Sequence, residues 1–314
     1  MLEDFLLSAN AVVPMFLLMA AGYAAREAGI LERGDVFRFN RAAFRIFLPC
    51  LLFMNIYESD LHAAANPGLI LFSVAGVLLV FFASCVGVKY LEPLENRKGV
   101  VAQGIFRSNF VIMGLPVAEV LTGGENLGSV TLLIAIVVPL FNFLAVFVLE
   151  TFRGGKVKPG EVLLEILKNP LVVSSLLGIL FQMLSVRLPG LVETAVSNLG
   201  RIATPLQLFL LGAFFRFDGM KVRLRPVITV TAVKLFVTPG LILPAAAVAG
   251  FRGAEFIALI GVFATPTAVN SFTMVQQMHC GDEELAGNIV VATSAVSMLS
   301  LFLWILLFRH LGMF

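Results

Sequence analysis

The sequence predicts an all-α integral membrane protein of ten transmembrane helices, built as two inverted five-helix repeats with broken, crossing helices 4 and 9. Three observations predict this fold. Hydrophobic residues make up 59% of the 314 and charged residues only 13%, whereas soluble domains carry about 25% charged residues. Apolar segments near the ~20 residues that cross a bilayer recur along the chain. Two of them, at 99–121 and 255–278, are interrupted by polar residues and a proline.

The ten expected spans follow one another with short connections. The second span is the least apolar, because three arginines occupy its first half and place that end at the cytoplasmic surface. The spans are Phe5–Ala24, Val36–Tyr57, Gly68–Tyr90, Gly99–Leu121, Leu127–Leu149, Leu167–Leu184, Leu191–Phe215, Arg225–Ala249, Glu255–Met278 and Leu285–Phe308.

The distribution of basic residues predicts the orientation. With the N-terminus outside, sixteen of the 22 Lys and Arg residues fall in inner loops and three in outer loops. Cytoplasmic loops of membrane proteins carry such an excess of positive charge. The sequence therefore predicts a multi-pass protein of the cell inner (cytoplasmic) membrane with both termini outside.

A short basic segment divides the chain into two halves. We expect residues 151–160 to form a cytoplasmic linker between a first five-helix repeat, 1–150, and a second, 161–314. Because each half has an odd number of spans, the second half enters the membrane from the opposite face and the repeat is inverted. Pro49 in span two and Pro205 in span seven are expected to correspond, and Pro239 marks a further break or hinge.

The interruption at residues 103–116 is the most informative stretch. Pro116 lacks a backbone donor and Gly114 permits non-helical dihedral angles, so a helix break is expected here. Unpaired backbone in hydrocarbon costs several kcal/mol per group, so a break persists only where protein buries it or it lines a wet cavity. A simple proline kink is the alternative. The similarly placed interruption at 264–271 favours a transporter binding site instead.

Half-helices that begin after Pro116 and Pro266 would bring two positively polarised N-termini to the membrane centre, where they favour an anion. Asn109 and Asn270 fit two roles there, ligand contact and capping of freed backbone groups, and the two roles can coexist. The expected substrate-binding residues are Asn109, Gly114, Pro116, Thr265, Pro266, Thr267, Asn270 and Ser271.

Two basic residues, Arg107 and Lys234, lie within or at the edge of spans, where charges normally face a cavity or a partner. Lys234 could attract an anionic substrate or support a broken helix through backbone carbonyls, and Arg107 could instead snorkel to the cytoplasmic face. No Asp or Glu lies clearly at the midplane, so the sequence does not support proton coupling through a central carboxylate; if such coupling exists, Glu119, near the first break, is the best candidate. Sodium held by neutral oxygens is the alternative, so the coupling ion, Na⁺ or H⁺, stays open.

Several classes of function lack support in the sequence. Nucleotide-binding glycine loops and zinc-protease motifs are absent, so no enzyme activity is expected. The three cysteines and three histidines are dispersed and predict neither a metal site nor a cofactor. Basic patches with interleaved aromatic residues are missing, which excludes nucleic acid as a predicted partner.

A set of short motifs in order carries a resemblance to a known family. The motifs are Asn109-x-x-x-x-Gly114-Leu115-Pro116, Asn169-Pro170 with Ser174-Ser175-Leu176-x-Gly178, Leu210-Leu211-Gly212, Lys234 before Pro239, Pro266 before Asn270, and Pro14 with Pro49. With them the chain resembles the auxin efflux carrier family over essentially its full length. The resemblance implies a scaffold and a transport domain each drawn from both repeats, elevator-like movement and a homodimer. It also implies substrate contact by Asn109 and Pro116, with Pro266 at the second crossing.

Departures from the plant members change the expected substrate. The linker is short, Leu171 follows Asn169-Pro170, and Lys234 stands where plant members often carry arginine. The chain is more similar to bacterial carriers of malate and malonate. We therefore expect secondary active or facilitative transport of a small organic anion of this kind. The alternatives are an auxin-like weak-acid efflux carrier, or an anion channel or sensor with a transporter fold.

Overall fold

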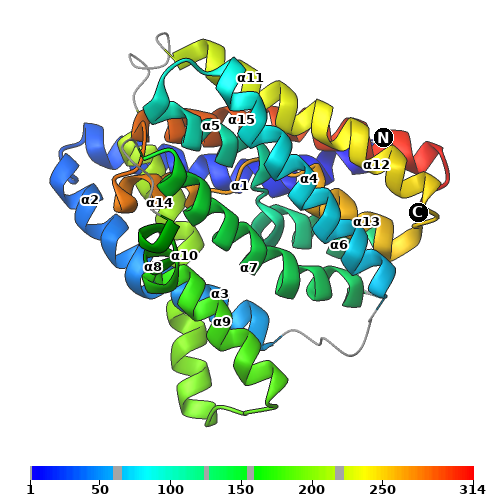
Figure 1. The fold of residues 1–314 in the computed structure, drawn as a ribbon, viewed down its shortest axis with the longest axis horizontal. Coiled ribbons are helices and arrows are strands. Elements are labelled where there is room, and N and C mark those ends of the chain that lie inside the picture. Colours follow the sequence, from blue (N-terminus) through cyan, green and yellow to red (C-terminus); the bar gives the residue numbers. More distant parts are fainter. Residues whose placement is uncertain (1, 59–65, 124–126, 154–158, 216–222) are drawn as a thin grey trace.

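The structure, shown in Figure 1, is a computed structural model that describes residues 2–58, 66–123, 127–153, 159–215 and 223–314. Within these ranges the chain is helical and contains no β-strand. The all-α class is thus confirmed. The elements are α1 (Leu2–Glu27), α2 (Arg33–Ala42), the π-helical turn η1 (Ala43–Phe47), α3 (Leu48–Tyr57), α4 (Pro67–Leu91), α5 (Glu95–Phe106), the π-helical turn η2 (Phe110–Gly114), α6 (Leu115–Leu121), α7 (Gly128–Thr151), α8 (Pro159–Lys168), α9 (Pro170–Met183), α10 (Gly190–Phe214), α11 (Leu224–Ala232), the π-helical turn η4 (Val233–Val237), α12 (Thr238–Val248), α13 (Gly253–Phe263), α14 (Asn270–Met278) and α15 (Glu283–His310).

Among the described residues, five helical segments are long and apolar enough to cross a membrane, namely Gly34–Tyr57, Pro67–Leu91, Gly128–Thr151, Leu224–Val248 and Glu283–His310. Shorter apolar helices cover Phe110–Leu121, Pro170–Met183 and Gly253–Phe263. The chain is therefore a multi-pass membrane protein. The count of ten spans and the inverted repeat stay predictions, and most of the expected linker, residues 154–158, lies outside the described residues.

Three prolines follow π-helical turns. In each case the residue before the proline donates its N–H to the carbonyl five residues earlier: Leu48 to Ala43, Leu115 to Phe110 and Thr238 to Val233. A proline ring clashes with the carbonyl four residues back, and the wider turn accommodates it while the helix continues. One such carbonyl, that of Leu235, accepts a hydrogen bond from the Trp304 indole at 2.8 Å.

Pro49, Pro205 and Pro239 therefore do not break their helices, and the hinge role that was the alternative stays a prediction. Pro49 and Pro239 sit in the first turn of α3 and α12, directly after η1 and η4, and the chain stays helical through both. Pro205 lies inside the continuous helix α10. Pro49 and Pro205, which were expected to correspond, lie in different local structures, since only Pro49 follows a π-helical turn.

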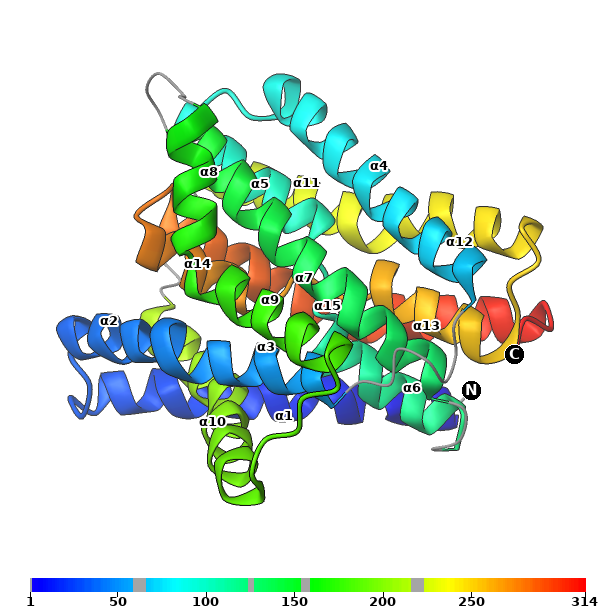
Figure 2. The ribbon, with the colours of Figure 1, turned by 60° about the horizontal axis from the view of Figure 1, so that its bottom comes forward.

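The helices pack as two groups. Helices α1, α2, α3, α9 and α10 pack mainly on one another, and we call them the first group. Helices α4 to α7 and α11 to α15 form the second group. Figure 2 shows α1, α2, α3 and α10 along one side and α4, α5, α11 and α12 along the other. In the first group α1 and α10 cross with backbones in contact, because Gly22 and Gly212 stand at the crossing.

A partly buried ionic cluster joins the starts of three helices in the second group. Asp282 caps α15 by accepting from the Leu285 amide at 3.0 Å, and its carboxylate also pairs with Arg97 in the first turn of α5 and with Arg223 just before α11, at 3.0 and 2.9 Å. Burial raises the pKa of Asp282, but hydrogen bonds from Arg223 and Leu285 and the charge of Arg223 lower it more, so the net pKa is lowered. The cluster fixes these helix ends relative to one another.

Candidate functional site

The two interrupted helices meet at a short antiparallel pairing, which we call the crossover and define as residues 107–109 and 266–268. Ser108 and Thr267 form an isolated antiparallel bridge. The Asn109 N–H donates to the Pro266 carbonyl at 2.8 Å, and the Ala268 N–H donates to the Arg107 carbonyl at 3.4 Å. The freed backbone groups of both breaks thus satisfy one another, which removes much of the cost of interrupting two apolar helices.

The first break lies earlier than the sequence indicates. The chain leaves α5 after Phe106 and becomes helical again at Phe110. Gly114 has helical dihedral angles, φ −67° and ψ −41°, and Pro116 lies in the first turn of α6. The predicted helix start after Pro116 is therefore wrong. Tertiary pairing with the second break, rather than proline chemistry, decides where the helix opens.

Gly114 has a packing role instead. A Cβ atom on Gly114 would lie 2.5 Å from the Phe110 ring and 3.0 Å from the Cα atom of Gly261 on α13. A Cβ atom on Gly261 would lie 2.6 Å from the same ring. The two glycines let the helices on either side of the crossover approach closely, with one aromatic ring between them.

Two threonines of the second break donate hydrogen bonds to carbonyls near the ends of α5 and α13. The Thr267 hydroxyl donates to the Gly104 carbonyl near the end of α5 at 2.7 Å, and the Thr265 hydroxyl donates to the Gly261 carbonyl near the end of α13 at 2.8 Å. Both side chains are buried. They satisfy helix-terminal carbonyls, so they support the geometry of the crossover.

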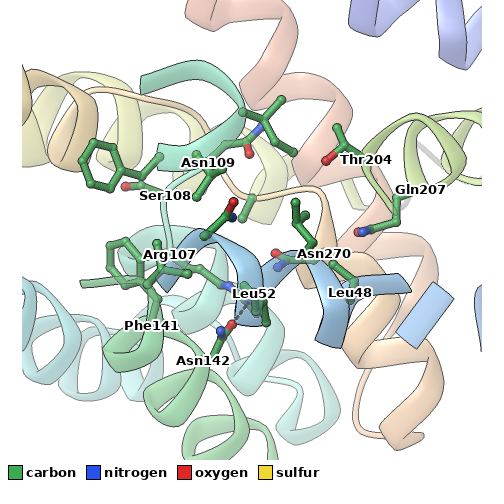
Figure 3. A pocket seen from close by; sticks show the side chains of 17 residues that line it. Leu48, Leu52, Arg107, Ser108, Asn109, Phe141, Asn142, Thr204, Gln207 and Asn270 are labelled. Carbon is green, nitrogen blue, oxygen red and sulfur yellow. Dashed lines mark hydrogen bonds between the residues drawn. The ribbon is translucent and has the colours of Figure 1, made fainter. Parts of the chain in front are cut away.

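A cavity of about 40 Å³ lies beside the crossover, between the two groups of helices. The first group contributes α3 and α10, and the second contributes the crossover, α7 and the first residue of α14. The helices starting at Phe110 and Asn270 both begin at its wall, where free N–H groups favour negative charge. Its polar lining, drawn in Figure 3, consists of Asn55, Arg107, Ser108, Asn109, Asn142, Thr204, Gln207 and Asn270.

Three amides of this lining have an atom without a partner among the described residues. They are the Nδ2 atoms of Asn55 and Asn109 and the Oδ1 atom of Asn270. Asn109 is 3% exposed, and neither Asn109 nor Asn270 makes a capping hydrogen bond through its side chain. A buried amide without a partner costs roughly 1–3 kcal/mol. Donors and an acceptor are thus available in the cavity, and the capping role predicted as an alternative is not seen.

Arg107 brings a buried cation to the cavity wall. It is 2% exposed, and its Nη2 donates to the Asn142 Oδ1 atom at 2.5 Å, the contact dashed in Figure 3. Its Nη1 contacts the Met274 sulfur. Among the described residues no carboxylate oxygen lies within 4.0 Å of its guanidinium. The side chain turns into the protein rather than snorkelling to an aqueous surface.

Lys234, in η4, supplies a second buried cation behind the crossover. It is 1% exposed and donates to the Ser108 hydroxyl, whose residue lines the cavity. Within the described ranges it too has no carboxylate within 4.0 Å. The hydrogen-bond partner of Lys234 is thus a side-chain hydroxyl, not the backbone carbonyl expected of a supporting lysine. Two buried basic side chains thus flank the crossover, and neither has an acid beside it among the described residues.

The predicted site residues separate into two sets. Arg107, Asn109 and Asn270 line the cavity. Ser271 is buried one residue further along α14, and its hydroxyl has no partner among the described residues. Glu119 is exposed on α6. The lining of the cavity does not include Gly114, Pro116, Glu119, Lys234, Thr265, Pro266, Thr267 and Ser271.

Sequence reasoning missed five polar residues of the lining, Asn55, Ser108, Asn142, Thr204 and Gln207. Ser108 lies between the predicted Arg107 and Asn109, whereas Asn142 follows Leu140-Phe141 in an apolar run of the most buried span. A single amide deep in an apolar helix is costly unless it has a hydrogen-bond partner. A lone amide residue in an apolar run is therefore the sequence feature that could have identified such positions.

Comparison with known proteins gives two matches. A family model described as membrane transport protein matches residues 7–305. An uncharacterized transporter of Methanothermobacter thermautotrophicus is 23% identical over 306 residues, which cover 96% of this chain and 98% of the relative.

Proposed function

The chain belongs to the membrane transport protein family, the auxin efflux carrier family, and on this premise we propose that it carries a small organic anion across the cytoplasmic membrane. The proposed carrier is secondary active or facilitative. Its binding site is the cavity beside the crossover, and substrate contact falls to Arg107, Asn109 and Asn270.

One observation carries the proposal: two buried basic side chains, Arg107 and Lys234, flank the crossover without a carboxylate beside them among the described residues. An uncompensated charge inside a protein costs several kcal/mol, so buried cations ordinarily have an acidic partner. A bound anion would supply that partner. The two helix starts and the unpaired Nδ2 atom of Asn109 act in the same direction, since they offer donors to carboxylate oxygens.

The size of the cavity supports transport by movement of one helix group against the other. The cavity has a volume of about 40 Å³, and one water molecule needs ~10–15 Å³ of such volume. The cavity therefore holds roughly three waters and is too small for a four-carbon diacid. Because the wall is shared by both groups, separating or sliding them enlarges the cavity without breaking either group. We propose an elevator-type alternating-access mechanism in which the second group carries the crossover past the first.

Two basic side chains beside the crossover favour a dianion over a monoanion, so carboxylates of malate or malonate type are the first candidates. The proposed carrier has ten spans in two inverted repeats, termini outside and a homodimeric assembly. Glu119, exposed on α6, offers no buried proton site, and the coupling ion, if any, is left to measurement.

Counterflow in proteoliposomes tests the proposed function. Vesicles loaded with unlabelled malonate or malate should take up the labelled anion transiently and saturably, and empty vesicles should take up less. Absence of counterflow for malonate, malate and indole-3-acetate would contradict the carrier assignment. Uptake of indole-3-acetate alone would favour the auxin-like alternative, whereas a non-saturating ionic current would favour a channel.

A further inference from the structure

We propose that Asn142 and Met274 determine the charge selectivity of the cavity, because they hold Arg107 in place through neutral acceptors and leave its positive charge free for a ligand. The inference rests on the proposed function. It concerns two residues that do not themselves carry charge and that act through the guanidinium, so we call them positioning residues.

Asn142 is fixed in one orientation by a relay of hydrogen bonds. Its Oδ1 atom accepts from Arg107 at 2.5 Å, and its Nδ2 atom donates to the Ser175 hydroxyl at 3.4 Å. Ser175 in turn donates to the Leu171 carbonyl at 2.7 Å. Because the amide nitrogen faces Ser175, the amide oxygen faces the guanidinium. Asn142 is fully buried, so water does not replace this contact.

Met274 holds the guanidinium from a different helix. It lies on α14, one turn beyond Asn270, and is fully buried. Its sulfur is contacted by the Nη1 atom of Arg107 and lies 3.8 Å from the Nε2 atom of Gln103. A thioether is a weak, uncharged acceptor. At this position a carboxylate would be the ordinary partner of a buried arginine.

Arg107 is thus anchored from α7 and α14 at once, yet keeps its full charge at the cavity wall. A carboxylate at either anchor would form an internal ion pair and leave no charge for an external anion. The identity of residues 142 and 274, rather than that of Arg107 alone, therefore decides whether the cavity binds anions.

The test uses the full-length purified protein and isothermal titration with malonate, malate and acetate. Two acidic variants, Asn142→Asp and Met274→Glu, are compared with matched neutral variants, Asn142→Ser and Met274→Gln. We expect the acidic variants to bind malonate at least about 30-fold more weakly than their neutral matches. The ligand-free acidic variants should melt at or above the temperature of their matches, because the new carboxylate pairs with Arg107.

Opposite changes in affinity and stability distinguish this role from simple packing, which would lower both together. Equal malonate affinity in an acidic variant and its neutral match would overturn the inference while leaving the proposed function intact. Failure of both acidic variants to fold would also overturn it, since the added carboxylate is expected to stabilise. If the wild-type protein binds none of the three anions, the proposed function fails, and the inference fails with it.

Discussion

Replacing Asn109 by leucine should stabilise the ligand-free protein and abolish transport. The side chain is 3% exposed and its Nδ2 atom has no partner among the described residues. Leucine has nearly the same shape, and removing an unsatisfied buried amide recovers about 1–3 kcal/mol. The backbone hydrogen bond from residue 109 to Pro266 does not involve the side chain and should persist. Anion uptake should fall to background, because the donor in the cavity is gone.

The matched control is the same substitution at Asn169. That side chain caps α9 by accepting from the Leu171 amide at 3.0 Å, so leucine there should cost about 0.5–2 kcal/mol. The free energy of unfolding of both variants can be compared by denaturant titration in the same detergent. The reasoning is refuted if Asn109→Leu destabilises the protein as much as Asn169→Leu, since the amide would then have a partner in the native state.

Three further predictions test the packing and the charges around the site. Gly261→Ala should cost about 1–3 kcal/mol of unfolding free energy, because the added Cβ atom would overlap the Phe110 ring. The control Gly34→Ala, which has open space around it, should stay within about 1 kcal/mol of wild type. Equal melting temperatures of the two variants would contradict the close packing at Gly261. Asp282→Asn should destabilise the protein at neutral pH by about 1–3 kcal/mol. Folding lowers the pKa of Asp282, so the stabilisation that its carboxylate provides is complete above its ordinary pKa of 3.8 and disappears as pH falls through the lowered pKa. The difference in unfolding free energy between wild type and Asp282→Asn should therefore close in acid and not in base. Lys234→Gln should raise the melting temperature of the ligand-free protein yet weaken malonate binding by about tenfold or more. Unchanged malonate affinity in titration calorimetry would show that Lys234 does not contribute to anion binding.

The sequence predicted the existence of the two breaks better than their position. Hydropathy and the paired prolines identified the interrupted segments, because interrupted backbone in an apolar helix is costly and therefore conspicuous. The exact opening at residues 107–109 depends on pairing with residues 266–268, which are far away along the chain. Local reasoning placed the break at Gly114 and Pro116, where a π-helical turn absorbs the proline and the helix continues.

The polar wall of the cavity was only half predictable for a similar reason. Asn109 and Asn270 stand beside the breaks and attract notice in the sequence. Asn142 and Gln207 lie in continuous helices, α7 and α10, and only the packing of those helices brings their amides to the crossover. The absence of an acid beside Arg107 among the described residues is likewise a tertiary fact, which composition does not reveal.

The most direct measurement is the location of a heavy-atom anion in the protein. Crystals grown with bromomalonate, measured at the bromine absorption edge, would show the anion as an anomalous peak. We expect this peak in the cavity between Asn109 and Asn270, with a carboxylate turned toward Arg107. A peak elsewhere on the protein, with the cavity beside the crossover empty under saturating bromomalonate, would contradict it.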